Sequence, residues 1–184
     1  HNKAAVQVRE DMKKMVQMPI LRPRAVAAKD TKLFGVTLFE LREQGLVEDG
    51  VPLVVRRMVE YLRKDLHREG LFRVNGNVRA VETLKQRLEH GEDVDLLSES
   101  DSLTIASLLK QYLRDLPGGL VDLTVQQALI QHYQVRHLLL QLPDIHHSLL
   151  RYLCHFLTLV ESNHKDNRMT ALNLATVFGP SVFQ

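Results

Sequence analysis

Apolar residues recur at three- and four-residue steps along most of the chain, whereas the two-residue alternation of a half-exposed strand is almost absent. Steps of three and four place side chains on one face of an α-helix. Between residues 51 and 66 these steps are followed by Val51, Val54, Val55, Met58, Leu62 and Leu66, and Pro52 suits a first helical turn. The pattern therefore predicts an all-α protein.

The same spacing predicts the remaining helices. Asn77 is a suitable N-cap for a helix with Val78, Val81, Leu84 and Leu88 on its apolar face, and Gly91 lies just beyond its end. Later helices are expected at about residues 102–115, 123–134, 135–141, 145–162 and 168–177. Gly179 and Pro180 are expected to end the last of them.

The amino-terminal segment differs from the rest of the chain. Its start, AAVQVREDMKKMV, has the apolar spacing of an amphipathic helix, and residues 19–32 contain two prolines and mixed charge, which is typical of a linker. With acidic residues among its lysines, this helix is expected to dock on protein rather than on a membrane. The sequence therefore predicts a helix and linker in residues 1–32 and a helical domain in residues 33–184.

Composition narrows the class of protein. The 184 residues are 45% hydrophobic and 25% charged, which fits one globular domain, and the net charge of +2 is too small to indicate nucleic-acid binding. A single cysteine excludes an internal disulfide framework. Because the chain has neither a secretory signal nor a run of 18 apolar residues, we expect a soluble, cytoplasmic protein.

Residues 70–77, GLFRVNGN, contain the first candidate functional residue. Arg73 stands between Phe72 and Val74, in a run without any acidic residue. Leu71, Phe72 and Val74 offer enough apolar area to hold this helix-to-helix loop on the helices beneath it. The backbone around Arg73 is therefore expected to be fixed although it is not helical.

Two interpretations of Arg73 stay open at this point. Gly70 and Gly76 permit sharp turns on either side, which would present the arginine to a partner. Alternatively, Arg73 pairs with a carboxylate such as Glu60 or Glu69 and closes the loop. Residue spacing does not decide between them.

Two further segments contain polar residues on apolar helices. In SLTIASLLKQYLRDLPGGL, Lys110 and Arg114 are four residues apart and share one helix face, either as ordinary solvated surface or around an anion. In NRMTALNLATVFGP, Asn173 interrupts an apolar helix. A buried amide needs partners, so Asn173 either bonds a neighbouring helix or reaches a surface loop.

Taken in this order and at these separations, the segments GLFRVNGN, LLKQYLRDLP and NRMTALNLATVFGP resemble the RhoGAP domain, the helical GTPase-activating module for Rho-family small GTPases. The likeness runs from about Leu33 to Phe183. The segments KAAVQVREDMKKM, KLFGVTL and RVNGN are most similar to the family-with-sequence-similarity-thirteen proteins, which carry such a domain. The resemblance implies a single-domain helical bundle of the RhoGAP type.

The resemblance also implies roles for four residues. Arg73 matches the catalytic arginine finger, Lys110 and Arg114 match the basic pair on the GTPase-facing helix, and Asn173 matches the asparagine that steadies the GTPase contact. The implied partner is a Rho-family GTPase, namely Rho, Rac or Cdc42, which brings the GTP and magnesium. The chain has no G-x-x-x-x-G-K-[ST] phosphate loop, so no cofactor of its own is expected. It is predicted to be a GTPase activator and not itself an enzyme.

The chain departs from the family pattern in two places. It has LPGGL where the family commonly has LPxPL, with Gly119 in place of the second proline, and HYQ runs directly into VRHLLLQLP where the family has a longer connection. The first departure puts in doubt the rigidity of the loop beside Arg114. It keeps open the alternative of a RhoGAP-like interaction module that binds a GTPase, or another partner, without accelerating hydrolysis.

Histidines and the one cysteine gather near the carboxyl-terminal third. His146, His147, Cys154 and His155 do not form the two-pair spacing of a zinc site, so no metal is expected. Cys154 lies among leucines and phenylalanines and is expected in the core.

Overall fold

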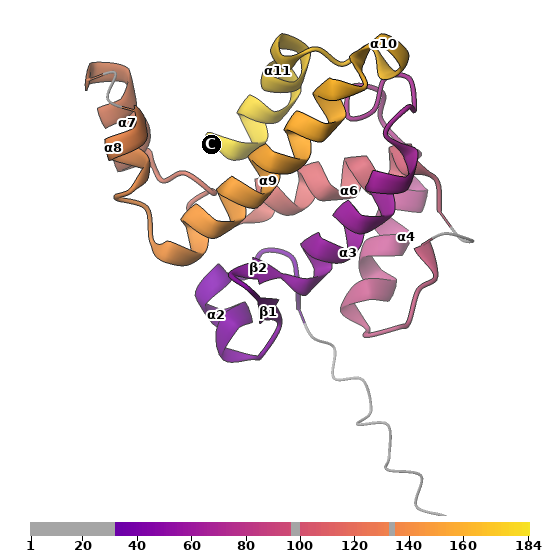
Figure 1. Cartoon of the computed structure of the whole chain (residues 1–184). Helices are drawn as coiled ribbons and strands as arrows, with labels where there is room; N and C mark the ends of the chain where they lie inside the picture. Colours follow the sequence, from indigo (N-terminus) through magenta and orange to yellow (C-terminus); the bar gives the residue numbers. More distant parts are fainter. Residues whose placement is uncertain (1–31, 97–99, 133–134) are drawn as a thin grey trace, which may run out of the picture.

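The structure is a computed structural model that describes residues 32–96, 100–132 and 135–184 (Figure 1). The predicted amino-terminal helix lies outside the described residues, as does the junction between HYQ and VRHLLLQLP at residues 133–134.

The described chain is helical apart from one short hairpin, which confirms the all-α class. In chain order the elements are α2 (Leu38–Glu43), β1 (Val47–Glu48), β2 (Val51–Pro52), α3 (Leu53–Leu62), the 3₁₀ turn η1 (Arg63–Asp65), α4 (Val78–Glu89), α6 (Ser102–Asp115), α7 (Leu123–His132), α8 (Val135–Leu139), α9 (Asp144–Ser162), α10 (His164–Asn167) and α11 (Ala171–Val182). The strands β1 and β2 pair antiparallel, with Val47 opposite Pro52.

Helix α6 is the centre of the bundle. Helices α3, α4 and α11 all pack against it, and α9 packs against α11 and against α2 (Figure 1). The apolar stripe of α6 is wide, and it includes the fully buried residues Ile105, Leu108, Leu109 and Leu113. A stripe of this width lets one helix contact neighbours on several sides.

Helix α3 follows the predicted stripe. Val54, Val55, Met58 and Leu62 are buried, while Pro52 is the N-cap rather than part of the first turn. After Leu62 the chain tightens into the η1 turn and then leaves the helix.

Helix α4 begins where the sequence predicts. The Asn77 side chain accepts hydrogen bonds from the backbone N–H groups of Arg79 and Ala80, at 2.9 and 3.1 Å. This satisfies two of the donors that every helix start leaves unpaired. However, Val78 is 81% exposed, so its assignment to the apolar face is wrong.

The sequence pattern misses α2 and the β1–β2 hairpin. Thr37 caps α2 by accepting from the Glu40 N–H at 3.2 Å, and the hairpin turns through Asp49 and Gly50, whose φ angles are +49° and +75°. A capping pair and an Asp-Gly turn are both local signals. The prediction misses these elements because they are too short to show a recurring spacing of apolar residues.

Helix α11 does not end at Gly179 and Pro180, contrary to the prediction. It continues to Val182, and the Phe183 N–H still bonds the Gly179 carbonyl at 2.8 Å. Pro180 removes one backbone donor, but Val182 beyond it is buried in the core. Burial of the last turn therefore outweighs the local cost of the proline.

Candidate functional site

The segment between η1 and α4, residues 66–77, is here named the Arg73 loop. Leu71 and Phe72 are fully buried, and the Phe72 ring packs edge to face on Phe156 of α9 and Phe178 of α11, with centroids 6.0 and 4.7 Å apart. Val74 is 44% exposed, so the expectation that it anchors the loop is wrong. Of the three apolar side chains expected to anchor the loop, only Leu71 and Phe72 are buried in the core.

The backbone at Phe72 is unusual. Its φ of +73° lies in the left-handed region, which a bulky residue rarely adopts. This angle turns the Phe72 ring inward while the next side chain points away from the core. Such strain persists only where the surrounding packing holds it, and it is frequent at functional sites.

The turn at Phe72 leaves Arg73 exposed, which agrees with the interpretation in which the loop presents the arginine to a partner. The N–H groups of Arg73 and Val74 both donate to the Gly70 carbonyl, at 2.9 and 2.8 Å, which makes the turn tight. The Arg73 guanidinium forms no hydrogen bond or ion pair with the residues that the structure describes. Glu69 instead faces Arg168, at 3.5 Å, so the interpretation in which Arg73 pairs with Glu69 is not observed.

The two glycines of the loop serve different purposes. Gly70 has a φ of +72°, which the turn requires. Gly76 lies against α6 so closely that a Cβ there would be 2.6 Å from the Thr104 Cα, and its N–H donates to the Ser107 hydroxyl at 2.9 Å. The sequence suggested a turn at both positions, but at Gly76 the reason is close packing.

Lys110 differs most from its prediction. The side chain is only 8% exposed, and its Nζ donates to the Phe72 carbonyl at 2.5 Å and to the Asn75 Oδ1 at 3.5 Å. Burial, and then the nearby Arg114 charge, lower the pKa of Lys110. The prediction of two exposed cations on one face is therefore wrong. Lys110 holds the strained Phe72 peptide from below.

Arg114 is exposed. It borders a groove of about 380 Å³ between α4, α6 and the Arg73 loop, whose lining includes Asn75, Val78 and Lys110. Its own backbone is fixed, because the Gln184 side chain donates to the Arg114 carbonyl at 2.6 Å. The Arg114 side chain has no hydrogen bond or ion pair among the described residues, so it offers a cation next to the loop that presents Arg73.

Gly119 occupies the position where the sequence departs from the family pattern. It is buried with a φ of +76°, and its N–H bonds the Leu116 carbonyl at 2.9 Å. A proline, whose φ is fixed near about −65° and which has no N–H, could not adopt this conformation. The loop after Arg114 therefore follows a path that needs glycine and is held by hydrogen bonds.

Asn173 is half-buried in the first turn of α11. Its Nδ2 donates to the Arg168 carbonyl at 3.2 Å, in the turn between α10 and α11. It therefore reaches a surface turn, and the alternative of a bond to a neighbouring helix is not observed. The adjacent Leu172 is 76% exposed.

Sequence reasoning missed Asn167. This residue is fully buried at the end of α10, and its carbonyl accepts the Gly70 N–H at 2.8 Å. In the sequence it stands in the polar stretch NHKDNR, where nothing distinguishes it from a surface residue. Only the fold shows that it lies beneath the Arg73 loop.

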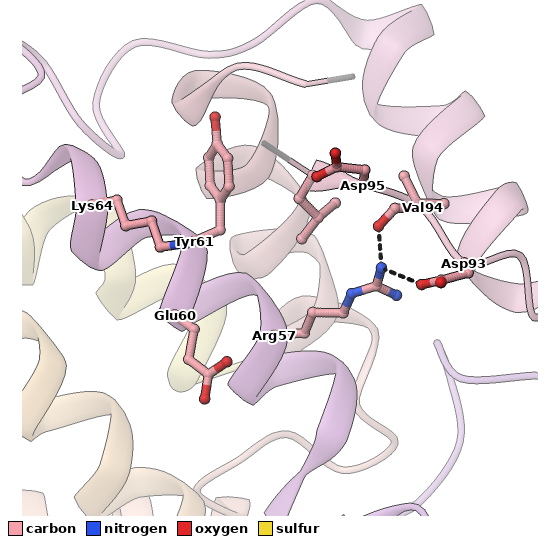
Figure 2. Close-up of a pocket in the computed structure, with 8 residues that line it drawn as sticks. Arg57, Glu60, Tyr61, Lys64, Asp93, Val94 and Asp95 are labelled. Carbon is pink, nitrogen blue, oxygen red and sulfur yellow. Dashed lines mark hydrogen bonds and ion pairs between the residues drawn. The ribbon is translucent and has the colours of Figure 1, made fainter. Parts of the chain in front are cut away.

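A second cavity, of about 350 Å³, lies between α3 and the segment that follows α4 (Figure 2). Figure 2 shows the Arg57 guanidinium pointing to the Val94 carbonyl and to the Asp93 carboxylate, to which it is bonded. Because this arginine is already engaged and acidic groups share the lining, the cavity is a poor site for a phosphate.

The histidine and cysteine region is also partly different from its prediction. Cys154 is exposed on α9, so its assignment to the core is wrong. The His146 Nδ1 lies 2.9 Å from the Leu120 carbonyl. Among the described residues, no helix combines the length and the apolar character needed to cross a membrane.

Comparison with known proteins gives a consistent result. The family model for the RhoGAP domain matches residues 52–184. Rho GTPase-activating protein 24 of Mus musculus is 33% identical over an alignment 188 positions long, which takes in 95% of this chain and 25% of that protein. Rho GTPase-activating protein gacJJ of Dictyostelium discoideum is 34% identical over 164 residues, covering 83% and 18%. The chain thus spans a quarter or less of the length of these two relatives.

Solved structures agree with the sequence relatives. The crystal structure of human Rho GTPase activating protein 15 superposes with a TM-score of 0.78 at 25% identity, covering 84% of this chain and 78% of that one. The BH domain from Graf gives a TM-score of 0.66 at 28% identity, covering 71% and 78%. The domain boundary at residue 33 and the finer likeness to the family-with-sequence-similarity-thirteen proteins stay predictions. Because the family model covers most of the chain, and relatives above 30% identity cover more still, this chain belongs to the RhoGAP domain family.

Proposed function

We propose that this domain stimulates GTP hydrolysis by a Rho-family small GTPase, and that Arg73 is the arginine finger it supplies. The observation that carries the proposal is the state of Arg73: an exposed guanidinium, without a partner among the described residues, on a loop fixed by buried Leu71 and Phe72. A cation that must reach another protein's phosphate has to be both free and precisely mounted.

The chemistry explains the need for an arginine. As the bond to the γ-phosphoryl group breaks, negative charge develops on the phosphate oxygens, and a GTPase without its own cation there is slow. A guanidinium supplied by a partner is worth about 10³- to 10⁵-fold in rate. At 1.36 kcal/mol per decade, this corresponds to roughly 4 to 7 kcal/mol of barrier.

The domain would provide one catalytic group and a docking surface, while the GTPase brings GTP and magnesium. In this proposal it is an activator and not a complete enzyme. Arg114 and Asn173 are assigned to GTPase binding, because both lie near the molecular surface on helices beside the Arg73 loop. Lys110 is assigned to the support of the loop, since its ammonium group already donates a hydrogen bond to the Phe72 carbonyl.

Single-turnover GTP hydrolysis by Rho, Rac and Cdc42, with and without the domain, tests the proposal. We expect Arg73→Ala to lower the stimulated rate by a large fraction of about 10³- to 10⁵-fold, with normal folding and near-normal binding to the GTPase loaded with a GTP analogue. Arg73→Lys should restore little, because an ammonium lacks the planar fork of the guanidinium.

A comparison of two GTPase states separates the finger from a docking residue. Binding to the GTPase with GDP and aluminium fluoride, a transition-state mimic, should suffer more from Arg73→Ala than binding to the GTP-analogue state. Stimulation that survives Arg73→Ala would contradict the assignment. Tight binding by the intact domain without any stimulation, for all three GTPases, would favour the alternative of a non-catalytic interaction module.

A further inference from the structure

Asn167 uses its whole side chain to join three parts of the fold. Its Nδ2 donates to the Leu66 carbonyl at 2.9 Å and to the Val160 carbonyl at 2.7 Å, and its Oδ1 accepts the Met169 N–H at 2.7 Å. The residue is fully buried. Leu66 begins the Arg73 loop, Val160 belongs to α9, and Met169 precedes α11. A carboxamide supplies the two donors and the acceptor that these three hydrogen bonds need.

The Asn167 backbone continues this network toward Arg73. Its carbonyl accepts the Gly70 N–H at 2.8 Å, and the Gly70 carbonyl in turn accepts the Arg73 N–H at 2.9 Å. Two consecutive hydrogen bonds therefore run from Asn167 to the backbone of Arg73. The intervening position requires glycine, because its φ is +72° and a Cβ there would be 2.5 Å from the Val74 side chain.

A hydrogen bond from the His67 ring and one ion pair lie on the outside of the same contact. His67 Nδ1 is 2.9 Å from the Asp166 carboxylate, and Glu69 is 3.5 Å from Arg168. All four side chains are more than half exposed, and exposed pairs contribute little to stability. The buried Asn167 between them is the group able to fix the geometry.

We propose that Asn167 is a positioning residue for Arg73, setting the start of the Arg73 loop while Lys110 and Gly76 hold its end. The inference rests on the proposed function of Arg73 and extends it to α10. Its physical basis is that a catalytic cation misplaced by about 1 Å can lose about 100-fold in rate. Docking through Arg114 on α6 should not depend on Asn167.

Asn167→Ser tests this role. Serine can still accept the Met169 N–H but cannot reach both the Leu66 and the Val160 carbonyls. We expect the stimulated rate of single-turnover GTP hydrolysis to fall about 10- to 100-fold. Binding to the GTPase loaded with a GTP analogue should change less than about 3-fold, while binding to the GDP and aluminium fluoride state should weaken at least about 10-fold.

A double-mutant cycle shows whether Asn167 acts through Arg73. In the Arg73→Ala background, Asn167→Ser should lower the residual rate by no more than about 2-fold, because the group that it positions is gone. Additive losses would overturn the proposal, since they would show an independent effect on the domain.

Leu41→Ala is the control for general loss of stability. Leu41 is fully buried in α2, at the opposite end of the molecule from α10 (Figure 1), and its truncation should destabilise the domain without reaching the loop. At a temperature where both variants are folded, Leu41→Ala should keep the stimulated rate of the intact chain. An equal loss in both variants would overturn the positioning role.

Amide hydrogen exchange gives a readout that is independent of catalysis. In the intact chain the Gly70 and Arg73 N–H groups should be protected although they lie in a loop, and a folded Asn167→Ser chain should lose that protection. Unprotected amides in the intact chain overturn the inference even if the variant does not fold. If the intact chain stimulates no GTPase, the proposed function fails, and the exchange result alone decides whether Asn167 fixes the backbone of Arg73.

Discussion

At the residue scale, two basic residues four positions apart have different environments. Lys110 is buried under the Phe72 carbonyl, whereas Arg114 is exposed on the same helix. One turn of α6 therefore separates a residue that supports the Arg73 loop from one that is free to meet a partner. Substitutions at the two positions should have separable effects.

We expect Lys110→Met to reduce stimulated hydrolysis by about 10- to 100-fold and to change GTP-analogue-state binding little, because the Phe72 peptide loses its donor. The Phe72 carbonyl, left buried without a donor, should lower the unfolding free energy by about 1 to 3 kcal/mol. Removal of the buried ammonium also removes its desolvation penalty, which offsets part of this loss. Urea unfolding and single-turnover rates measure the two effects. Lys85→Met is the matched control, since Lys85 is a partly buried lysine on α4 that pairs with Asp115 at 3.9 Å and lies over the Phe34 ring. A variant that loses binding and not rate would contradict the supporting role.

Arg114→Glu should have the opposite pattern of effects, with a change in GTPase binding and none in stability. Association with the GTPase should weaken, most strongly at low salt, while the melting temperature stays unchanged, because exposed charges steer encounter more than they stabilise a fold. Arg151→Glu, an exposed reversal on α9, controls for net charge. Equal effects of the two reversals on the association rate would show that only overall charge matters.

Tyr112 provides a test of stability against pH. Its hydroxyl is buried without a hydrogen-bond partner among the described residues, and burial raises the pKa of Tyr112 above its ordinary value of 10.0. Above that value the unfolded chain releases a proton that the folded chain keeps, so unfolding free energy should fall as the pH rises past 10. Tyr112→Phe should shrink this alkaline loss and, at neutral pH, be neutral or stabilising by about 1 kcal/mol. Urea unfolding of both chains at about pH 8 and about pH 11 makes the comparison, and an identical slope in both would contradict the assignment.

At the scale of elements, the Arg73 loop depends on how closely it approaches α6. A Cβ on Gly76 would lie 2.6 and 2.7 Å from the backbone of Thr104, which cannot move without the helix. We expect Gly76→Ala to cost about 1 to 3 kcal/mol in unfolding free energy and to lower stimulated hydrolysis as the loop is displaced.

Gly179→Ala is the matched control, because a Cβ there meets nothing within 4 Å beyond its own helix and chain neighbours, and the residue is inside α11. The gain in helix propensity of about 0.5 to 1 kcal/mol is opposed by the contact between the new Cβ and the ring of Pro180, which follows directly in the chain. Thermal unfolding should therefore show a smaller loss of stability for Gly179→Ala than for Gly76→Ala. Equal losses in the two variants would mean that the contact with Thr104 does not limit residue 76.

At the scale of the whole molecule, the described residues contain a continuous core from Phe34 to Val182. We expect a chain that starts at Lys32 to unfold in one transition, with a melting temperature within about 2 °C of the full chain and the same stimulated rate. Calorimetry of both chains measures this. A large loss on removal of residues 1–31 would show that the amino-terminal segment packs on the domain, and the predicted boundary at residue 33 would then be wrong.

The sequence by itself determined the helical class, most helix positions and the segments that carry the site. Helical periodicity and capping are local, so α4 with its Asn77 cap and α6 with Ser102–Asp115 could be predicted from neighbouring residues alone. The ordered motifs around Arg73, Arg114 and Asn173 likewise required no coordinates.

Tertiary structure decided what those residues contact. In the sequence Lys110 and Arg114 are both basic residues of one predicted helix, and nothing distinguishes their environments. In the fold the Arg73 loop covers Lys110, which donates to the Phe72 carbonyl, and leaves Arg114 exposed. The positive φ of Phe72, the continuation of α11 past Pro180 and the position of Asn167 beneath Gly70 depend on burial and on distant partners, such as Lys110, 38 residues from Phe72, and Leu66, 101 residues from Asn167. Local propensity does not contain such long-range contacts, because their free energy exists only once the bundle has formed.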